Sequence, residues 1–464
     1  MTLGRSGWIT LAIAAAITFY QIILPPAIGI ADNGDFAKII GKFDLKAPVD
    51  DSDDRSFTYI HLRYTSAPAN HWDNGFHSSE TLLVRTALRL NRILSKDGAF
   101  DIRCMGVIHA LLFLLAFAFL LPLLRPTEGR LRIMLLVLAV LVFCDVAYAA
   151  YYNSFYMDAG AFVFFLLAIV FLVHAVSVRQ HCSASVCHFA LLFCLLFVTS
   201  KPQHALLGIP LALFFFWRRS SLLPSRSPVY GAVAAVSLAA SGLIALTLST
   251  PPGYTSPALF NMIFWGLLPS AQDPRAELAS LGLDESFLQY NGMYAYLSGS
   301  PMHSDSFAQE FSRKTSYSRL SIFYATHPRR ALDMVKIGLK EAARQRPPVL
   351  GNFDRSAGYP PYFQSSAFSV WSMAKTRYFS ARPWSYLLAF AIATAIVTWR
   401  MPAGGLTLAT MGLLALTIGS LADACDVTRH LFLFNVIWDV AFFAAICTLA
   451  MGTQPHASAD PSAL

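Results

Sequence analysis

The sequence is short of charged residues. Asp, Glu, Lys and Arg make up 13% of its 464 residues, whereas hydrophobic residues make up 55%. Soluble domains use about a quarter charged residues, so this chain cannot cover a soluble surface of its size. The shortage excludes a soluble enzyme, a disordered chain and a nucleic-acid-binding domain, and it leaves a polytopic membrane protein.

Cysteine is also scarce, and its spacing indicates no chemistry. Four of the seven cysteines, Cys144, Cys187, Cys194 and Cys447, lie within apolar runs, as is typical of small core residues. The sequence contains no CxxC pair and no Cys/His metal spacing. The net charge of +8 accompanies no nucleic-acid-binding motif, because the basic residues flank apolar runs or lie in two long loops. We therefore expect neither a disulfide framework nor a nucleic-acid partner.

Long apolar runs, in contrast, are abundant. A membrane-spanning helix needs about 20 mainly apolar residues, and the chain offers ten candidates. The ten are 8–30, 104–124, 133–150, 159–178, 186–200, 203–217, 230–248, 384–399, 402–421 and 430–451. The fifth and sixth are short and flank Lys201-Pro202, so they form either two short helices or one re-entrant hairpin, and the flanking charges favour two helices. The predicted fold class is an all-α polytopic membrane protein.

Basic residues predict the orientation, because short loops rich in Lys and Arg stay in the cytoplasm. With the N-terminus inside, nine arginines lie on inner segments, and the short outer loops hold only Lys201 and Arg429. Both termini are then cytoplasmic. The first apolar run has a second interpretation as a cleaved signal peptide, since Gly29-Ile30-Ala31 resembles a cleavage site, although the run is long for one.

Two long loops remain on the outer side and define the predicted domains. These are an N-terminal module of seven spans (1–248) with an outer loop (31–103), a periplasmic loop domain (249–383), three C-terminal spans (384–451) and a cytoplasmic tail (452–464). Residues 79–94 carry one basic and one apolar stripe, which predicts an interfacial helix on anionic headgroups or, equally, an amphipathic helix packed on the outer domain. The apolar patch 257–269 is too short to span and is expected at the interface.

Two carboxylates directly follow the first span. Asp32 and Asp35 stand three residues apart, so one helical turn would place both on one face. A carboxylate at the membrane surface can act as a general base on a hydroxyl group. The pair can instead hold a hard divalent cation through its oxygens. In a third interpretation, Asp32 or Asn33 caps a short helix over 36–40.

Other polar residues are expected at the same outer level. Ionisable groups at membrane depth are costly, which makes them functional candidates. The competing interpretation is structural pairing, above all of Asp423 or Asp426 with Arg429. The residues of this layer are Asp145, Asn153, Tyr156, Asp158, Lys201, Gln203, His204, Asp423, Asp426, Arg429 and His430.

Three features together resemble the GT-C superfamily of membrane glycosyltransferases. An acidic motif, Asp32-Asn33-Gly34-Asp35-Phe36, follows the first span; Asp158 opens the fourth; and Ser200-Lys201-Pro202 joins two short spans. The Asp-Asn-Gly-Asp-Phe form, with Leu281-Gly282-Leu283-Asp284 and Arg429-His430-Leu431, is similar to a bacterial branch of glycan-biosynthesis hexosyltransferases. The resemblance covers most of the chain in order and topology.

The resemblance implies an inverting transfer of a sugar from a polyprenyl-phosphate donor to a glycan, lipid or protein acceptor. The site would face outward from the bacterial cytoplasmic (inner) membrane. Asp32 would be the catalytic base, with Asp35 as the alternative, since related enzymes often have Asp-Glu where this chain has Asp32-Asn33. The resemblance implies no certain cofactor, and a divalent cation at Asp32 and Asp35 stays an option. Donor-phosphate binding would fall to Lys201, Arg429 and His430, and substrate positioning to Asp158, Tyr156, Asn153 and Gln203.

Two rival functions use the same kind of substrate. A transporter or flippase for a lipid-linked glycan would spread charged residues through the bundle and usually repeat its halves. Here the charges cluster at the outer surface, and no internal repeat is visible. A glycan polymerase or ligase also uses lipid-linked donors and has a large outer loop, so only the acidic motif after the first span favours the transferase.

Overall fold

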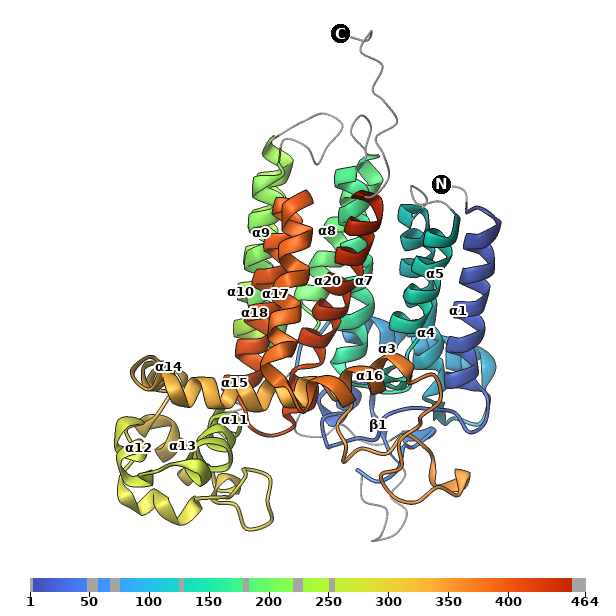
Figure 1. Cartoon of the computed structure of the whole chain (residues 1–464). Helices are drawn as coiled ribbons and strands as arrows, with labels where there is room; N and C mark the ends of the chain where they lie inside the picture. The colour runs from blue at the N-terminus through green and yellow to red at the C-terminus, as the bar shows by residue number, and fades with distance from the viewer. Residues whose placement is uncertain are drawn as a thin grey trace.

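The computed structural model describes residues 3–47, 57–66, 76–124, 129–177, 183–219, 228–249 and 255–452. Its helices form two layers (Figure 1). An upright bundle carries the long apolar helices, and a layer of shorter helices and loops covers one end of it. Helix α1 begins and helix α20 ends at the opposite end. We call the covered end the outer end.

The bundle contains the helices that the hydropathy pattern predicts. The chain is a multi-pass membrane protein, and the prediction of an all-α fold of this kind is confirmed. The bundle helices are α1 (Arg5–Ile23), α4 (Arg103–Leu120) continued by η2 (Leu121–Leu124), α5 (Gly129–Phe143), α7 (Met157–Ser177), α8 (Ala184–Val198), α9 (Gly208–Trp217), α10 (Pro228–Leu248), α17 (Pro383–Arg400), α18 (Pro402–Leu421) and α20 (Phe432–Gly452).

Not every one of the ten predicted segments forms a helix that is long enough to span a membrane by itself. Within the described residues, six helices are long and apolar enough to cross a membrane, or up to eight if each of two bent pairs counts as one span. The bent pairs are α5 with α6 (Val146–Tyr152), at 50°, and α16 (Val370–Phe379) with α17, at 118°. Helix α8 and the segment Pro202–Trp217 are apolar but short. They stand as two separate helices joined at Lys201, as the flanking charges favour.

Two predicted spans end or break earlier than expected, each for a local reason. Helix α1 ends at Ile23, because Pro25 and Pro26 cannot donate the backbone hydrogen bonds that would continue it. The predicted span 133–150 breaks at Asp145, whose carboxylate accepts a hydrogen bond from the backbone N–H of Ala147 at 2.8 Å and so caps α6. A polar residue inside an apolar run thus starts a new helix.

The first outer loop folds against the bundle. It contains α2 (Ala37–Ile40), η1 (Gly41–Phe43), α3 (Glu80–Leu94) and a small antiparallel sheet of β1 (Leu45–Lys46), β2 (Arg63–Ser66) and β3 (Phe100–Asp101). Helix α3 buries Leu83, Val84 and Ala87 and packs on α4, while Arg85 and Arg89 stay exposed. The apolar stripe of this helix therefore packs against the protein, and its basic stripe is exposed.

The second outer loop has its own hydrophobic cluster. Its elements are α11 (Thr255–Phe260), η4 (Asn261–Leu267), η5 (Leu268–Ser270), α12 (Pro274–Ser280), η6 (Glu285–Tyr290), η7 (Pro301–His303), α13 (Asp305–Lys314), α14 (Tyr317–Thr326), α15 (Pro328–Ala342), η8 (Arg355–Ala357) and α16. In the segment 257–269, which the sequence predicts at the membrane interface, Phe260, Ile263 and Phe264 are fully buried in this cluster. Helix α15 lies across the outer end of the bundle (Figure 1).

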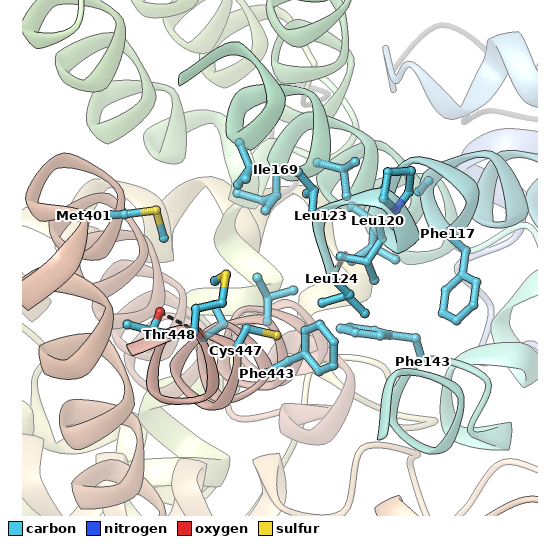
Figure 2. Close-up of a pocket in the computed structure, with 18 of the residues that line it drawn as sticks. Phe117, Leu120, Leu123, Leu124, Phe143, Ile169, Met401, Phe443, Cys447 and Thr448 are labelled. Carbon is cyan, nitrogen blue, oxygen red and sulfur yellow. Dashed lines mark hydrogen bonds between the residues drawn. The ribbon is translucent and has the colours of Figure 1, made fainter. Parts of the chain in front are cut away.

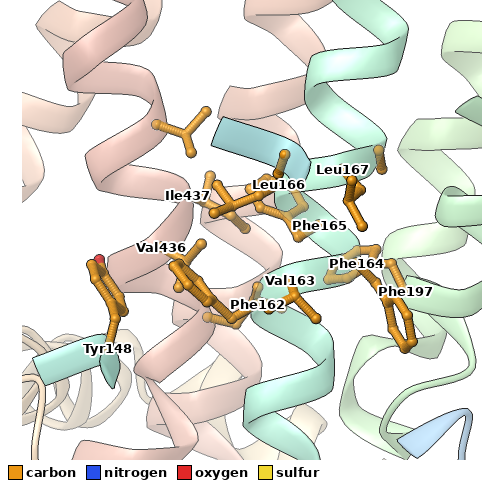
Figure 3. Packing of buried hydrophobic residues seen from close by; sticks show 14 of the residues in the cluster. Tyr148, Phe162, Val163, Phe164, Phe165, Leu166, Leu167, Phe197, Val436 and Ile437 are labelled. Carbon is orange, nitrogen blue, oxygen red and sulfur yellow. The ribbon is translucent and has the colours of Figure 1, made fainter. Parts of the chain in front are cut away.

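Helices α7 and α20 form the centre of the bundle. They are the most buried of the candidate spans, whereas α1 and α10 lie at the periphery. Figure 3 shows Phe162, Phe165 and Leu166 of α7 facing Ile437 of α20 and neighbouring side chains. Because α7 and α20 are fixed by this packing, the polar residues at their outer ends, Asp158 and the turn before α20, are held in defined positions.

Candidate functional site

The loop after α1 is held in a tight turn by Asp32. Its Oδ1 accepts hydrogen bonds from the backbone N–H of Gly34 at 2.8 Å and of Phe36 at 3.0 Å. Gly34 has φ +96°, a conformation that favours glycine. Among the described residues, Oδ2 of Asp32 accepts no hydrogen bond. Burial raises the pKa of Asp32 to about 6, even though the two backbone donors oppose the shift.

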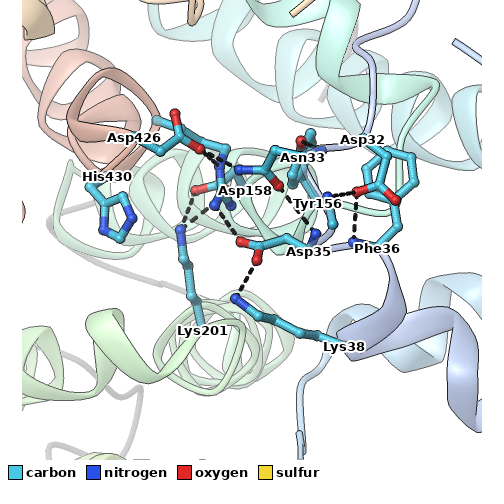
Figure 4. A network of polar contacts seen from close by, with 12 residues as sticks. Asp32, Asn33, Asp35, Phe36, Lys38, Tyr156, Asp158, Lys201, Asp426 and His430 are labelled. Atoms are coloured by element: carbon cyan, nitrogen blue, oxygen red, sulfur yellow. Dashed lines mark hydrogen bonds and ion pairs between the residues drawn. The ribbon is translucent and has the colours of Figure 1, made fainter. Parts of the chain in front are cut away.

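Tyr156 connects this turn to the start of α7. Its hydroxyl donates a hydrogen bond to the carbonyl of Ala31 at 2.9 Å and accepts one from the backbone N–H of Asn33 at 2.9 Å. The Asn33 side chain donates to Asp426 at 2.6 Å. Three segments far apart in the sequence therefore meet at the acidic motif (Figure 4).

Arg429 stands at the centre of a charge network. Its guanidinium contacts Asp35, Asp426 at 2.6 Å and Asp158 at 3.4 Å, and it lies over the ring of Tyr156 at 4.6 Å. Although burial opposes ionisation of Asp35, Arg429 and Lys38 lower its pKa. Asp35 is thus a permanent anion at neutral pH, which makes it a poor acceptor of a proton.

Lys201 closes the network from the turn between α8 and η3 (Pro202–Leu207). Its Nζ lies 2.9 Å from Oδ1 of Asp158, and both side chains are buried. Lys38 pairs with Asp35 in the same way. Three carboxylates and three cations thus balance one another. Beside them, Gln203 contacts Nδ1 of His430 at 2.6 Å.

A pocket of about 490 Å³ opens onto this network. Asp35, Asp426 and Arg429 line one part of it, and Tyr294 and Tyr296 of the second outer loop line another. The remaining lining residues are Asn33, Gly34, Lys38, Phe57, Val349, Leu350, Asp423, Cys425 and His430. Charged groups from the bundle and aromatic side chains from the outer layer therefore share one cavity, an arrangement that suits a polar ligand with a flat or apolar face.

Asp423 belongs to the outer polar layer predicted from the sequence, which gave it no catalytic or binding role. It lines the pocket, is buried, and forms no ion pair among the described residues, whereas Asp426 is the acid that pairs with Arg429. Burial raises the pKa of Asp423 to about 7, although Oδ1 accepts a hydrogen bond from the backbone N–H of Cys425 at 2.8 Å. The available signal was its place in a polar turn between two spans, three residues before Asp426.

The structure does not bring every predicted residue to the pocket. Asn153 is fully buried, and its amide donates to the carbonyls of Ile22 and Ile28 at 2.8 Å each, so it fixes the chain after α1. The carboxylate of Asp145 also binds backbone groups outside the pocket. It accepts a hydrogen bond from the backbone N–H of Ser372 at 2.9 Å, and it caps α6. Asp32 is part of the acidic turn, but it is not among the residues that line the pocket.

The residues of the acidic motif do not fit a divalent cation. One oxygen of Asp32 is taken by backbone donors, and Asp35 is taken by Arg429 and Lys38. In the part of the chain that the structure describes, no three His, Cys, Asp or Glu side chains are grouped to hold a metal ion. A cation would also have to displace Arg429, so we assign no step to one.

A second hollow lies between helices and is almost wholly apolar. It measures about 330 Å³ and is lined by side chains such as Phe117, Leu124, Phe143 and Phe443 (Figure 2). Thr448, which also lines it, donates its hydroxyl hydrogen bond to its own helix at 2.8 Å. Apart from Cys447 and Thr448 the lining is apolar, so this hollow offers no carboxylate or basic side chain, unlike the pocket at Arg429.

The model of a family described as the YfdI N-terminal transmembrane domain matches residues 5–459. No curated protein and no solved structure matches the chain. The family match thus covers the bundle, both outer loops and every residue of the site.

Proposed function

We propose that this chain, which belongs to the YfdI N-terminal transmembrane domain family, is an inverting glycosyltransferase that uses a polyprenyl-phosphate sugar. The family is associated with membrane glycosyltransferase-like proteins. The acceptor is a glycan, lipid or protein on the outer face of the bacterial cytoplasmic membrane. The observation that carries the proposal is the pocket at the outer end of the bundle, where Arg429 and four acidic or amide groups meet aromatic side chains.

The donor phosphate has a place beside Arg429. This guanidinium lines the pocket and forms ion pairs with several carboxylates. An incoming phosphate can therefore replace one carboxylate as the partner of Arg429 without leaving the buried guanidinium unpaired. Lys201, which forms an ion pair with Asp158, adds positive electrostatic potential near Arg429. Cations placed where negative charge develops stabilise the transition state of phosphate departure. His430, which also lines the pocket, is a donor to the same oxygens.

The base is a carboxylate that holds no cation. Asp35, Asp158 and Asp426 are neutralised together by Arg429, Lys38 and Lys201, which leaves Asp32 and Asp423. Both have pKa values raised by burial, to about 6 and about 7, close to the pH at which a general base works best. Asp32 is supported by its place in the acidic motif that resembles the GT-C superfamily, and Asp423 is supported by its place in the lining of the pocket. We propose Asp32 as the base, with Asp423 as the competing candidate.

The reaction is a single displacement. The carboxylate takes the proton of the acceptor hydroxyl, and the acceptor oxygen forms a bond to the anomeric carbon. The bond between that carbon and the phosphate oxygen breaks, and the polyprenyl phosphate leaves with the electron pair. Attack from the face opposite the phosphate inverts the anomeric configuration. Tyr156 and Asn33 hold the acidic turn in place during these steps.

Purified full-length chain tests the proposal directly. It is incubated in nanodiscs with defined polyprenyl-phosphate hexoses and candidate acceptors, and the products are identified by mass spectrometry. We expect a glycosylated acceptor with inverted anomeric configuration, and a loss of product in Arg429→Gln. Arg382→Gln, which removes an exposed arginine outside the pocket, serves as the matched control. Movement of the labelled donor across the bilayer without any product would instead identify a flippase.

A further inference from the structure

Helix α15 forms one wall of a second polar pocket at the outer end of the bundle. The pocket measures about 440 Å³. Lys336, Ile337 and Lys340 of α15 line it together with Ser380 and Ala381 of the turn between α16 and α17 and with Pro383, the first residue of α17. It shares no lining residue with the pocket at Arg429. We call it the shelf pocket.

The shelf pocket holds more positive than negative charge, because Arg330, Lys336 and Lys340 line it together with a single carboxylate, Asp333. Lys336 and Lys340 stand one helical turn apart on one face, and both are exposed. Within the described residues, neither forms an ion pair or a hydrogen bond. Like charges at this spacing destabilise a helix unless an anion lies between them. The neighbouring carboxylate, Asp333, lies 3.8 Å from Arg330, which is itself paired with Glu277.

A hydroxyl donor in the same pocket is also unsatisfied. Oγ of Ser380 is buried, and among the described residues it has no hydrogen-bond partner. A buried polar atom without a partner costs free energy, which a ligand oxygen would recover. Two ammonium groups and one hydroxyl around a single cavity match the oxygens of a phosphate group.

The depth of the shelf pocket indicates where that phosphate comes from. Pro383 begins α17, an apolar bundle helix, and Trp384 in its first turn is 42% exposed, as is typical of a membrane interface. Trp384, Leu388 and Ile392 recur every four residues and are all exposed, so they form one stripe down α17. Helix α15 buries Met334 and Leu339 toward the protein and exposes Leu332 and Ile337, as interfacial helices do.

We propose that the shelf pocket binds the phosphate of an anionic phospholipid, whose chains lie on the α17 stripe. Lys336, Lys340 and Ser380 hold the phosphate oxygens, and Trp384, Leu388 and Ile392 contact the acyl chains. The ligand is a structural lipid and takes no part in sugar transfer, because the shelf pocket is separate from the pocket at Arg429. It would fix the angle between α15 and α17, which carry the outer layer on the bundle.

Native mass spectrometry of the full chain tests this proposal without any activity assay. The chain is titrated in zwitterionic detergent with phosphatidylglycerol, phosphatidylcholine or a polyprenyl phosphate. Lys336→Gln/Lys340→Gln is compared with Arg275→Gln/Arg313→Gln, which removes the same charge from exposed positions of the outer layer. We expect the first variant to bind phosphatidylglycerol about 30-fold more weakly, at roughly 1 kcal/mol for each basic side chain. The control and phosphatidylcholine binding should not change.

Three results would overturn the proposal. One is equal phosphatidylglycerol binding by the two double variants. Another is equal binding of phosphatidylglycerol and phosphatidylcholine by the unmodified chain. The third is loss of polyprenyl-phosphate binding alone in Lys336→Gln/Lys340→Gln, which would identify the pocket as a second donor site. If the double variant does not fold, Lys340→Gln carries the same test with an expected loss of about fivefold.

Discussion

Two buried charge clusters at the outer end of the bundle invite comparison. The first is the network of Arg429 with Asp35, Asp426 and Asp158. The second surrounds Asp439 of α20, which lies 2.8 Å from Nζ of Lys375. Both join outer segments to a central helix, and both balance their charges. They differ in their access to a ligand, because a pocket reaches Arg429, whereas Lys375 and Asp439 are sealed by protein.

The sealed cluster is also the more completely bonded one. Asp439 accepts hydrogen bonds from Tyr148 and from Nε1 of Trp371 at 2.9 Å, and Lys375 donates to Asn435 at 2.9 Å. The carboxylate beside it, Asp145, is occupied by backbone donors at both oxygens, while the open cluster has Asp32 and Asp423, each with a single oxygen held by backbone donors. A charge network that is closed on all sides stabilises the attachment of α16 to α20, and one that borders a cavity can exchange a partner for a ligand.

The largest expected effect concerns the open cluster. Asp32→Asn should lower the rate of sugar transfer by about 10²–10⁴-fold while donor binding persists, because the amide keeps the shape of the carboxylate but cannot accept the proton. For the unmodified chain, kcat/KM should rise with pH through the pKa of about 6, since the base works when deprotonated. Rates and donor titrations of the purified variant measure both.

Two companion variants identify the base. Asp35→Asn should be less severe than Asp32→Asn, because Asp35 is already held by Arg429 and Lys38. If Asp423→Asn abolishes transfer and Asp32→Asn does not, Asp423 takes the role. Near-normal turnover in all three variants would refute the mechanism.

A substitution in the sealed cluster should lower the stability of the protein and leave the rate of sugar transfer nearly unchanged. Lys375→Met strands the buried carboxylate of Asp439, so we expect the free energy of unfolding to fall by about 3–5 kcal/mol. The transfer rate of the folded fraction should stay within a few-fold of normal. Thermal unfolding in detergent, with activity measured below the transition, separates the two effects. A loss of turnover in fully folded protein would show that this cluster also takes part in catalysis.

Lys201 lies between these extremes. It pairs with a buried carboxylate, as Lys375 does, but Arg429 also contacts Asp158 at 3.4 Å and can partly replace it. Lys201→Ala should therefore cost less stability than Lys375→Met and should weaken donor binding by about tenfold or more. A large fall in melting temperature with unchanged donor affinity would contradict a role for Lys201 at the phosphate.

The last expected effect is a pH-dependent gain of stability in Asp423→Asn. The pKa of Asp423 is about 7 in the folded chain against 3.8 for an ordinary aspartate, so between these pH values the folded state holds a proton that the unfolded state releases. Stability from this group is greatest at low pH and falls by up to about 1.4 kcal/mol for each pH unit up to 7. As the pH rises from 5 to 7, the free energy of unfolding of the variant should therefore increase relative to that of the unmodified chain. Thermal unfolding at both pH values, with Asp284→Asn as control, checks this.

Much of the fold could be predicted from the amino-acid order alone. Hydropathy locates a helix in each of the ten apolar segments, because a backbone in lipid must satisfy its hydrogen bonds within the segment. The same pattern could not place the breaks at Ile23 and Asp145, which depend on prolines and on one capping carboxylate. It also could not predict that residues 257–269 contribute to a buried cluster, because an apolar run suits a protein core and a membrane interface equally well.

The candidate site depended more on tertiary structure. The sequence by itself determined which ionisable groups stand at the ends of apolar runs, and so Asp32, Asp35, Asp158, Lys201 and Arg429 could be selected in advance. Only the packing of α7 against α20 decided that Arg429 holds Asp35 and Asp426, that Asn153 serves the backbone, and that Asp423 is left in the pocket without a cation. Charge is a property of single residues, whereas pairing depends on distances between segments that lie hundreds of residues apart in the chain.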